Sequence, residues 1–208
     1  MFFLNASAGC ATLRSKKRFL ILFLVAFMGA GHLVSQSSLH AIPGHSVGDV
    51  RLGSDLKQFS SVFPKHPNID EHYSKDWCGN EAYHWVDLDS GSGGVFAYLT
   101  GQRIVQLSIQ TGRYSLTNGL SVGSTEQRVK HYYPNARKYQ LLGSGGDING
   151  GRDLRYVVDK SSGVAFELYW DHRRKGRFVS AIDIFYPNAE FRPEDCVAPP
   201  RQWKVLPR

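Results

Sequence analysis

The chain contains two copies of one sequence pattern, and this internal repeat limits the possible folds more strongly than any other feature. With a shift of 70 positions, glycine, serine, apolar and proline residues recur in the same order. The matched pairs are Gly53 with Gly123, Ser54 with Ser124, Phe59 with Val129, Phe63 with Tyr133, Pro64 with Pro134, Phe96 with Phe166 and Tyr98 with Leu168. After a further slip of five residues, Ile104, Leu107 and Ile109 match Val179, Ile182 and Ile184. An ordered series of this kind indicates two structural units.

Both copies of the pattern predict a short helix. Ser54 and Ser124 are the expected N-caps, because a serine oxygen accepts hydrogen bonds from amides of the first helical turn. Ser124 and Gln127 also have the spacing of a capping box. Pro64 and Pro134 are expected to end the helices, because the residue before a proline is pushed out of the helical region.

The segments that follow each predicted helix have the composition of strands. They comprise residues 82–86, 95–100, 105–109, 154–158, 165–170 and 178–184. Short glycine-rich loops between strands favour an antiparallel meander. The predicted fold is therefore α+β, with two tandem repeats, each a short helix packed on an antiparallel β-meander. We expect a leader at residues 1–41, the first repeat at 42–112, the second repeat at 113–186 and a Pro-rich tail at 187–208.

The leader has the composition of an export signal. No Asp or Glu precedes position 49, and four basic residues between positions 14 and 18 are followed by an apolar run at 19–31. A basic segment before a short apolar run predicts a secretory signal peptide, cleaved after Gly31 or Ala41. The alternative is an uncleaved anchor at residues 19–34, although a spanning helix needs about 20 apolar residues. We therefore expect a periplasmic or secreted protein, which contacts a membrane only if this segment is uncleaved.

Removal of the leader lowers the net charge of the chain. The formal net charge is +7, but four of the 25 basic residues lie in the leader, so 21 basic residues remain against 18 acidic ones. This small excess does not indicate a nucleic-acid-binding protein. Residues 46–112 carry 5 basic and 8 acidic residues (−3), whereas residues 113–186 carry 12 basic and 7 acidic residues (+5).

Two cysteines, Cys78 and Cys196, remain in the chain after the leader. Cysteine pairs in exported proteins often form disulfides. A bond between these two would close a long loop and contribute about 4 kcal/mol in the chain-entropy model. The alternative is a reactive thiol.

No segment carries a strong signature of catalysis or of a metal site. His66, Asp70, His72 and Cys78 lie close together in the sequence, but their spacing matches no common zinc pattern. The segment 143–153 has oxygen ligands at alternate positions, yet it lacks the glutamate of an EF-hand loop. The motifs H-E-x-x-H and C-x-x-C do not occur. The letters G-x-S-x-G occur at residues 44–48 and 119–123, but neither stretch directly follows a predicted strand, as the nucleophile elbow of a hydrolase does. We therefore predict no catalytic residue, no metal ligand and no cofactor.

The densest basic cluster lies at the tip of an expected hairpin, in the residues that the second repeat has in excess of the first. Arginine and aromatic residues are over-represented in protein interfaces. The candidate partner-binding residues are therefore the cluster and its aromatic neighbours: Tyr169, Trp170, Arg173, Arg174, Lys175 and Arg177. The alternative is a solubilising turn without a partner.

Residues 119–129, Gly-Leu-Ser-Val-Gly-Ser-Thr-x-x-x-Val, open the second predicted helix. This phrase resembles the tandem small α+β modules of the β-lactamase-inhibitor-protein type and of the SmpA/OmlA outer-membrane assembly lipoproteins. The first copy matches the pattern more loosely, and Cys10 precedes the apolar run, where it cannot carry a lipoprotein lipid. The resemblance implies a binding module, either an inhibitor of an exported enzyme or an envelope scaffold.

We therefore predict an exported, non-enzymatic protein that binds or inhibits another extracytoplasmic protein, such as an exported enzyme. Two alternatives stay open. One is an envelope scaffold or assembly factor, and the other is an exported hydrolase or small-ligand binder with a site between the repeats.

Overall fold

The computed structural model describes residues 39–63, 74–75, 81–86, 93–141, 154–193 and 203–207. Four sequence predictions lie outside these ranges: the signal or anchor segment, the Cys78–Cys196 disulfide, the segment with His66, Asp70 and His72, and the loop 143–153. Neither helix in the described ranges has the length and hydropathy that a membrane span requires.

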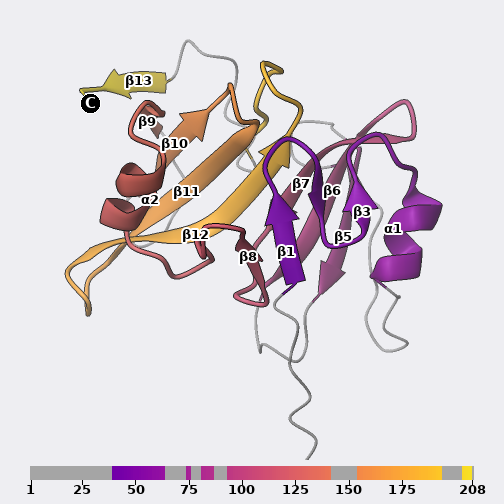
Figure 1. Ribbon diagram of the computed structural model, residues 1–208, viewed down its shortest axis with the longest axis horizontal. Coiled ribbons are helices and arrows are strands. Elements are labelled where there is room, and N and C mark those ends of the chain that lie inside the picture. The colour runs from indigo at the N-terminus through magenta and orange to yellow at the C-terminus, as the bar shows by residue number, and fades with distance from the viewer. Residues whose placement is uncertain are drawn as a thin grey trace, which may run out of the picture. The chain divides into compact units, whose positions relative to one another are not determined.

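Nine strands form one large sheet, in which every neighbouring pair is antiparallel. The strand order is β13-β9-β10-β11-β12-β7-β6-β5-β4 (Figure 1). The strands are β4 (Ser74–Lys75), β5 (Glu81–Val86), β6 (Gly94–Thr100), β7 (Arg103–Ile109), β9 (Arg137–Leu141), β10 (Arg155–Asp159), β11 (Val164–Asp171), β12 (Gly176–Phe185) and β13 (Trp203–Leu206).

A second, four-stranded sheet and two short helices lie on one face of the large sheet (Figure 1). The small sheet has the order β3-β2-β1-β8, and its strands are β1 (Leu39–Ile42), β2 (Ser46–Val47), β3 (Val50–Arg51) and β8 (Tyr114–Leu116). Strand β1 runs parallel to β8, so this sheet joins the start of the described chain to its middle. The helices are α1 (Leu56–Val62) and α2 (Glu126–Tyr132).

The prediction of two tandem helix-plus-meander units is wrong, because the strands of both halves belong to one sheet. Strand β7 of the first half pairs with β12 of the second half, with Ile109 opposite Ile182. Two separate meanders would each expose an edge strand with unpaired N–H and C=O groups, and the β7–β12 pairing removes both edges. The helices have only seven residues each, and residues of the small sheet such as Ala41, Val47 and Leu116 complete the core on that face. The fold is therefore mostly β.

Both helices occur where the sequence places them, but their N-caps lie one residue later than predicted. Asp55 caps α1 by accepting from the N–H of Gln58 at 3.0 Å. Thr125 caps α2 by accepting from the N–H of Arg128 at 3.3 Å. Ser124 closes the preceding turn instead, where its oxygen accepts from the N–H of Ser121 at 3.0 Å. The predicted capping box is therefore absent from α2.

The turn before each helix makes the same main-chain contacts with the large sheet. The recurring hydrogen bonds, donor first, are Gly53 to Ile104 (2.7 Å) and Ile104 to Ser54 (2.9 Å), and Gly123 to Val179 (2.8 Å) and Val179 to Ser124 (2.9 Å). Both glycines adopt a left-handed conformation, with φ of 85° and 86°. Since the sequence repeat aligns Ile104 with Val179, the repeat marks a local contact that the fold uses twice.

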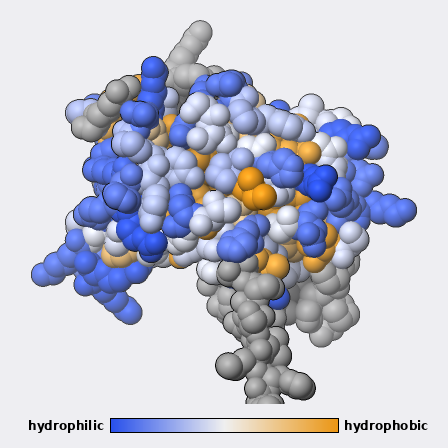
Figure 2. Space-filling model, in the orientation of Figure 1, coloured by the Kyte–Doolittle hydropathy of each residue, from blue (hydrophilic) through white to orange (hydrophobic). Residues whose placement is uncertain are grey.

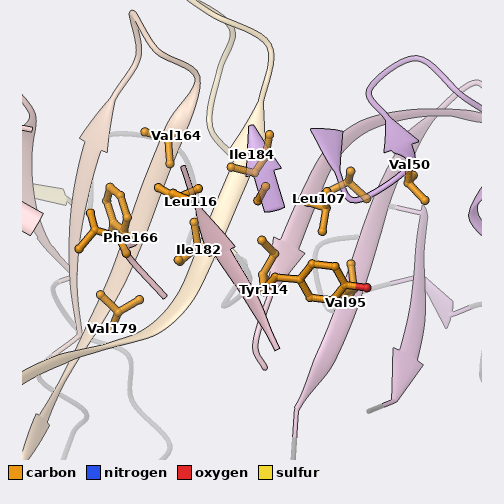
Figure 3. Packing of buried hydrophobic residues seen from close by; sticks show 14 of the residues in the cluster. Val50, Val95, Leu107, Tyr114, Leu116, Val164, Phe166, Val179, Ile182 and Ile184 are labelled. Carbon is orange, nitrogen blue, oxygen red and sulfur yellow. The ribbon is translucent and has the colours of Figure 1, made fainter. Parts of the chain in front are cut away.

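The main core lies between the large sheet, the small sheet and the helices. Figure 3 shows side chains of β7, β8, β11 and β12 in one interior, among them Leu107, Leu116, Phe166 and Ile182. The end of each helix adds aromatic contacts: Phe63, which follows α1 as its C-cap, lies 5.1 Å from Trp85, measured between ring centroids. Complete burial of one such side chain stabilises the fold by about 1.5–3 kcal/mol. Hydrophobic burial therefore explains why both seven-residue helices persist.

The opposite face of the large sheet, here called the outer face, is covered in part by the segment 186–193. A second apolar cluster there contains Tyr156, Phe185 and Phe191, with ring centroids of Phe191 5.4 Å from Tyr156 and 5.6 Å from Phe185. The beginning of the Pro-rich tail is thus packed on the sheet. The end of the tail forms β13, which pairs with β9 at the sheet edge.

Candidate functional site

All six predicted partner-binding residues lie on the hairpin of β11 and β12. Its last three cross-strand pairs are Tyr169 with Phe178, Trp170 with Arg177 and Asp171 with Gly176, and residues 172–175 form the tip. The hairpin extends past α2 at the lower left of Figure 1. In Figure 2, hydrophilic side chains cover this projecting tip.

The corresponding hairpin of the first half, between β6 and β7, is shorter. Thr100 pairs with Arg103, so only Gly101 and Gln102 form its turn. Both turn residues have positive φ, 55° and 67°, as in the tight turns that match the twist of paired strands. A two-residue turn is therefore sufficient for this part of the fold, and the longer β11–β12 tip is not required to connect the strands.

Asp171 fixes the conformation of the tip. Its Oδ1 accepts from the main-chain N–H groups of Arg173 at 2.8 Å and Arg174 at 3.0 Å. Its Oδ2 accepts from Nε of Arg174 at 2.6 Å. The hydrogen bonds from the main chain and side chain of Arg174 lower the pKa of the Asp171 carboxyl, so the turn holds Asp171 in its ionised form.

The Arg174 side chain is held on one face of the hairpin. Its Nη2 donates to the hydroxyl of Tyr169 at 2.8 Å. Its guanidinium carbon lies 3.5 Å from the ring centroid of Phe178, at cation–π distance. The face with Tyr169 and Phe178 is therefore occupied by contacts within the hairpin.

Trp170 lies on the other face, because adjacent cross-strand pairs point to opposite sides of a sheet. Its side chain is 43% exposed, and its ring stands edge-on to His172 at 6.5 Å between centroids. Arg177 is 8% exposed, and its guanidinium carbon lies 5.7 Å from the Trp170 ring centroid. Arg177 therefore supports the indole and is not part of the exposed tip.

Two cations of the tip extend into solvent. Arg173 and Lys175 are exposed, and their side chains have no hydrogen-bond or ion-pair partner within the described ranges. Lys175 adopts a left-handed conformation with φ of 50°, which completes the turn. The candidate site therefore combines two unpaired cations with one exposed indole on a fixed turn.

A second charged group ties α2 to strand β9 of the large sheet. Oε1 of Glu126 lies 3.2 Å from Nζ of both Lys130 and Lys138. Burial acts to raise the pKa of Glu126, but the hydrogen bonds from the two lysines outweigh burial and lower it. This group is a structural link, since each member already has a partner.

The outer face contains a buried polar contact that the sequence did not predict. Gln106 and Asp183 are 1% and 3% exposed, and Nε2 of Gln106 donates to Oδ1 of Asp183 at 3.2 Å. The sequence feature that could have predicted this contact is a glutamine, Gln106, within the otherwise apolar run of β7. Among the residues that the structure describes, no three His, Cys, Asp or Glu side chains are grouped closely enough to hold a metal ion.

No family model matches the chain. None of the curated proteins matches it either. A similar solved structure is that of YfeY, an uncharacterized protein from Escherichia coli, with 12% identity and a TM-score of 0.42 over 69% of this chain and 98% of that one. The resemblance to inhibitor and assembly-lipoprotein modules remains a prediction that these comparisons do not test.

Proposed function

We propose that this protein is an exported, non-enzymatic binding protein that binds or inhibits another extracytoplasmic protein through the β11–β12 hairpin. The observation that carries the proposal is the difference between the two hairpins. The β6–β7 hairpin closes with two residues, whereas the β11–β12 hairpin adds a longer tip that concentrates cations and an exposed tryptophan.

The fixed conformation of the tip supports a role in binding. A loop that is already ordered loses little conformational entropy when it meets a partner. Asp171 and Arg174 supply this order through contacts within the hairpin. Trp170 and Arg173 are of the residue types that carry most binding energy in protein interfaces.

The charge of the second half supports an acidic partner. Residues 113–186 carry 12 basic and 7 acidic residues, and the free cations of the tip are at its most projecting point. Opposite charge on a partner accelerates association and favours one orientation of encounter.

The export part of the proposal depends on the leader, and β1 adds one constraint. Strand β1 begins at Leu39, and Ala41 is fully buried. Cleavage after Ala41 would remove three of the four residues of β1, so cleavage after Gly31 is the site compatible with the fold. An uncleaved anchor at 19–34 leaves the folded part on the same side of the membrane, attached to it.

The test is affinity capture from envelope and culture-medium extracts with residues 38–208 as bait. The matched bait replaces residues 172–175 with the two-residue Gly-Gln turn of the other hairpin. We expect the native bait to retain an exported protein that the matched bait does not retain. Equal retention by both baits would contradict the proposal.

A further inference from the structure

We propose that the Trp170 face of the β11–β12 hairpin binds an extended acidic peptide segment of the partner. This inference rests on the proposed function and specifies the partner's chemistry. In this arrangement Trp170, Arg173 and Lys175 contact the segment, whereas Tyr169, Arg174 and Arg177 position the contact residues.

The two faces of the hairpin differ in which side chains a binding partner can reach. On one face, Arg174 is bound by Asp171, Tyr169 and Phe178, so its cation and both rings are already in contact. On the other face, the indole of Trp170 is 43% exposed. An incoming chain can therefore reach the indole and the free cations together only from the Trp170 side.

The main-chain amides of the tip exclude a small phosphate-like anion as the preferred ligand. Sites for such anions usually present several free N–H groups in a concave turn. Here the N–H groups of Arg173 and Arg174 already donate to Asp171. The free cations of the tip, the side chains of Arg173 and Lys175, are long and separate, and they suit carboxylates distributed along a chain.

The position of Trp170 argues against insertion into an anionic membrane. Proteins that insert a tip place the aromatic or aliphatic residue where it meets the lipid first. In this hairpin the leading residues 172–175 are His, Arg, Arg and Lys, and Trp170 stands behind them on the strand. A peptide laid along the hairpin can contact the indole and the leading cations at once.

The test measures binding of poly-L-glutamate to the chain of residues 38–208 by isothermal titration calorimetry at low salt. Arg173→Gln with Lys175→Gln should weaken binding about fivefold to tenfold, as expected for two exposed ion pairs. Trp170→Ala should weaken binding by at least about fivefold, because exposed tryptophans often act as contact hot spots. Tyr169→Phe keeps the ring and removes the support of Arg174, so it should have a smaller effect.

The matched control is Arg51→Gln with Lys57→Gln, which removes two exposed positive charges from β3 and α1, away from the hairpin. Native-like binding by this control, together with the losses above, supports the proposal. Equal weakening by both double variants overturns it, since binding then reflects net charge alone. Equal thermal midpoints and circular dichroism spectra establish that the variants are folded.

Two further ligands separate the alternatives. Inorganic phosphate should show no binding that depends on Arg173 and Lys175, and vesicles of phosphatidylcholine with phosphatidylglycerol should not retain the chain. Hairpin-dependent retention by vesicles without binding of poly-L-glutamate overturns the proposal in favour of a lipid surface. If extracts show hairpin-dependent capture but poly-L-glutamate does not bind, the acidic-segment inference fails while the proposed function stands.

Discussion

The side-chain amide of Gln106 pairs with the main chain of Arg192 as a neighbouring strand would. Its Nε2 donates to the carbonyl oxygen of Arg192 at 2.6 Å, and its Oε1 accepts from the N–H of Arg192 at 3.0 Å. One side chain thus fixes the segment 186–193 on the outer face of the large sheet.

Replacement of Gln106 by leucine should therefore destabilise the fold. The change removes the hydrogen bonds of Gln106 to two main-chain groups of Arg192 in a partly buried site, which costs about 1–3 kcal/mol. Urea denaturation followed by circular dichroism measures the loss. Gln127→Ala, on the exposed side of α2, should change the free energy of unfolding by less than about 0.5 kcal/mol. Similar losses in both variants would contradict this account of Gln106.

Substitution by alanine should destabilise the fold more at Gly163 than at Gly123. Both have positive φ, 68° and 86°, so alanine at either position costs about 1–2 kcal/mol in backbone strain. A Cβ on Gly163 would also lie 2.1 Å from the carbonyl oxygen of Phe185, whereas a Cβ on Gly123 meets nothing within 4 Å. Gly163→Ala should therefore be destabilising by at least about 3 kcal/mol once this overlap is included. The thermal unfolding midpoints of the two variants measure the two losses of stability. A lower midpoint for Gly123→Ala than for Gly163→Ala would refute this prediction.

Acid should weaken the link between α2 and β9. The pKa of Glu126 is lower in the folded chain than in the unfolded chain, so its contribution is present above the unfolded pKa and is lost as pH falls through the folded pKa. Because the group is partly exposed, the contribution is below about 1 kcal/mol.

The variant Glu126→Gln should lose less stability than the native chain when pH is lowered through this range. Urea midpoints at neutral and acid pH measure the difference. Glu190→Gln removes an exposed carboxylate without a described ion pair and serves as the control. A native-like pH dependence of Glu126→Gln would show that the link contributes nothing.

The mature chain should begin between residues 32 and 38. Cleavage after Gly31 leaves β1 intact, so that it can pair with both β2 and β8. N-terminal sequencing of the exported protein identifies the cleavage site. A mature chain that begins at Ile42 would mean that the small sheet forms without most of β1, and the described pairing would then be wrong.

The sequence predicted local structure well and the arrangement of the sheet poorly. Helices, their proline ends and most long strands follow from residue type and spacing, since those signals act over a few neighbours. The small sheet was missed because its strands have two to four residues, too few for alternation to show. The β7–β12 pairing was missed because it joins residues more than 70 positions apart, which no local pattern reports.

One alignment error shows why register is difficult to predict. The sequence repeat matches Phe96 with Phe166, but the structure pairs Val95 with Ile109 and Val164 with Ile184. Since the repeat aligns Ile109 with Ile184, Val164 is the equivalent of Val95, and the alignment is one residue off. A one-residue slip moves a side chain to the other face of a sheet. Phe166 is accordingly in the main core, whereas Phe96 is not.

The sequence predicted which residues belong to the candidate site, but not the face of the hairpin on which each of them lies. A run of cations beside two aromatic residues indicated a contact surface, and the structure places all six on one hairpin. The separation into a bound face with Arg174 and an open face with Trp170 depends on cross-strand pairing. The burial of Arg177 likewise depends on neighbours that are distant in sequence.

The parallel pairing of β1 with β8 has a consequence for the order in which the chain can fold during its synthesis. The leading strand at Leu39 finds its parallel partner only when Tyr114 to Leu116 have emerged, and the first-half sheet finds β12 only near residue 185. Pairings of such long sequence separation form slowly. The first half of the structure therefore cannot be completed until almost the whole chain has been synthesised.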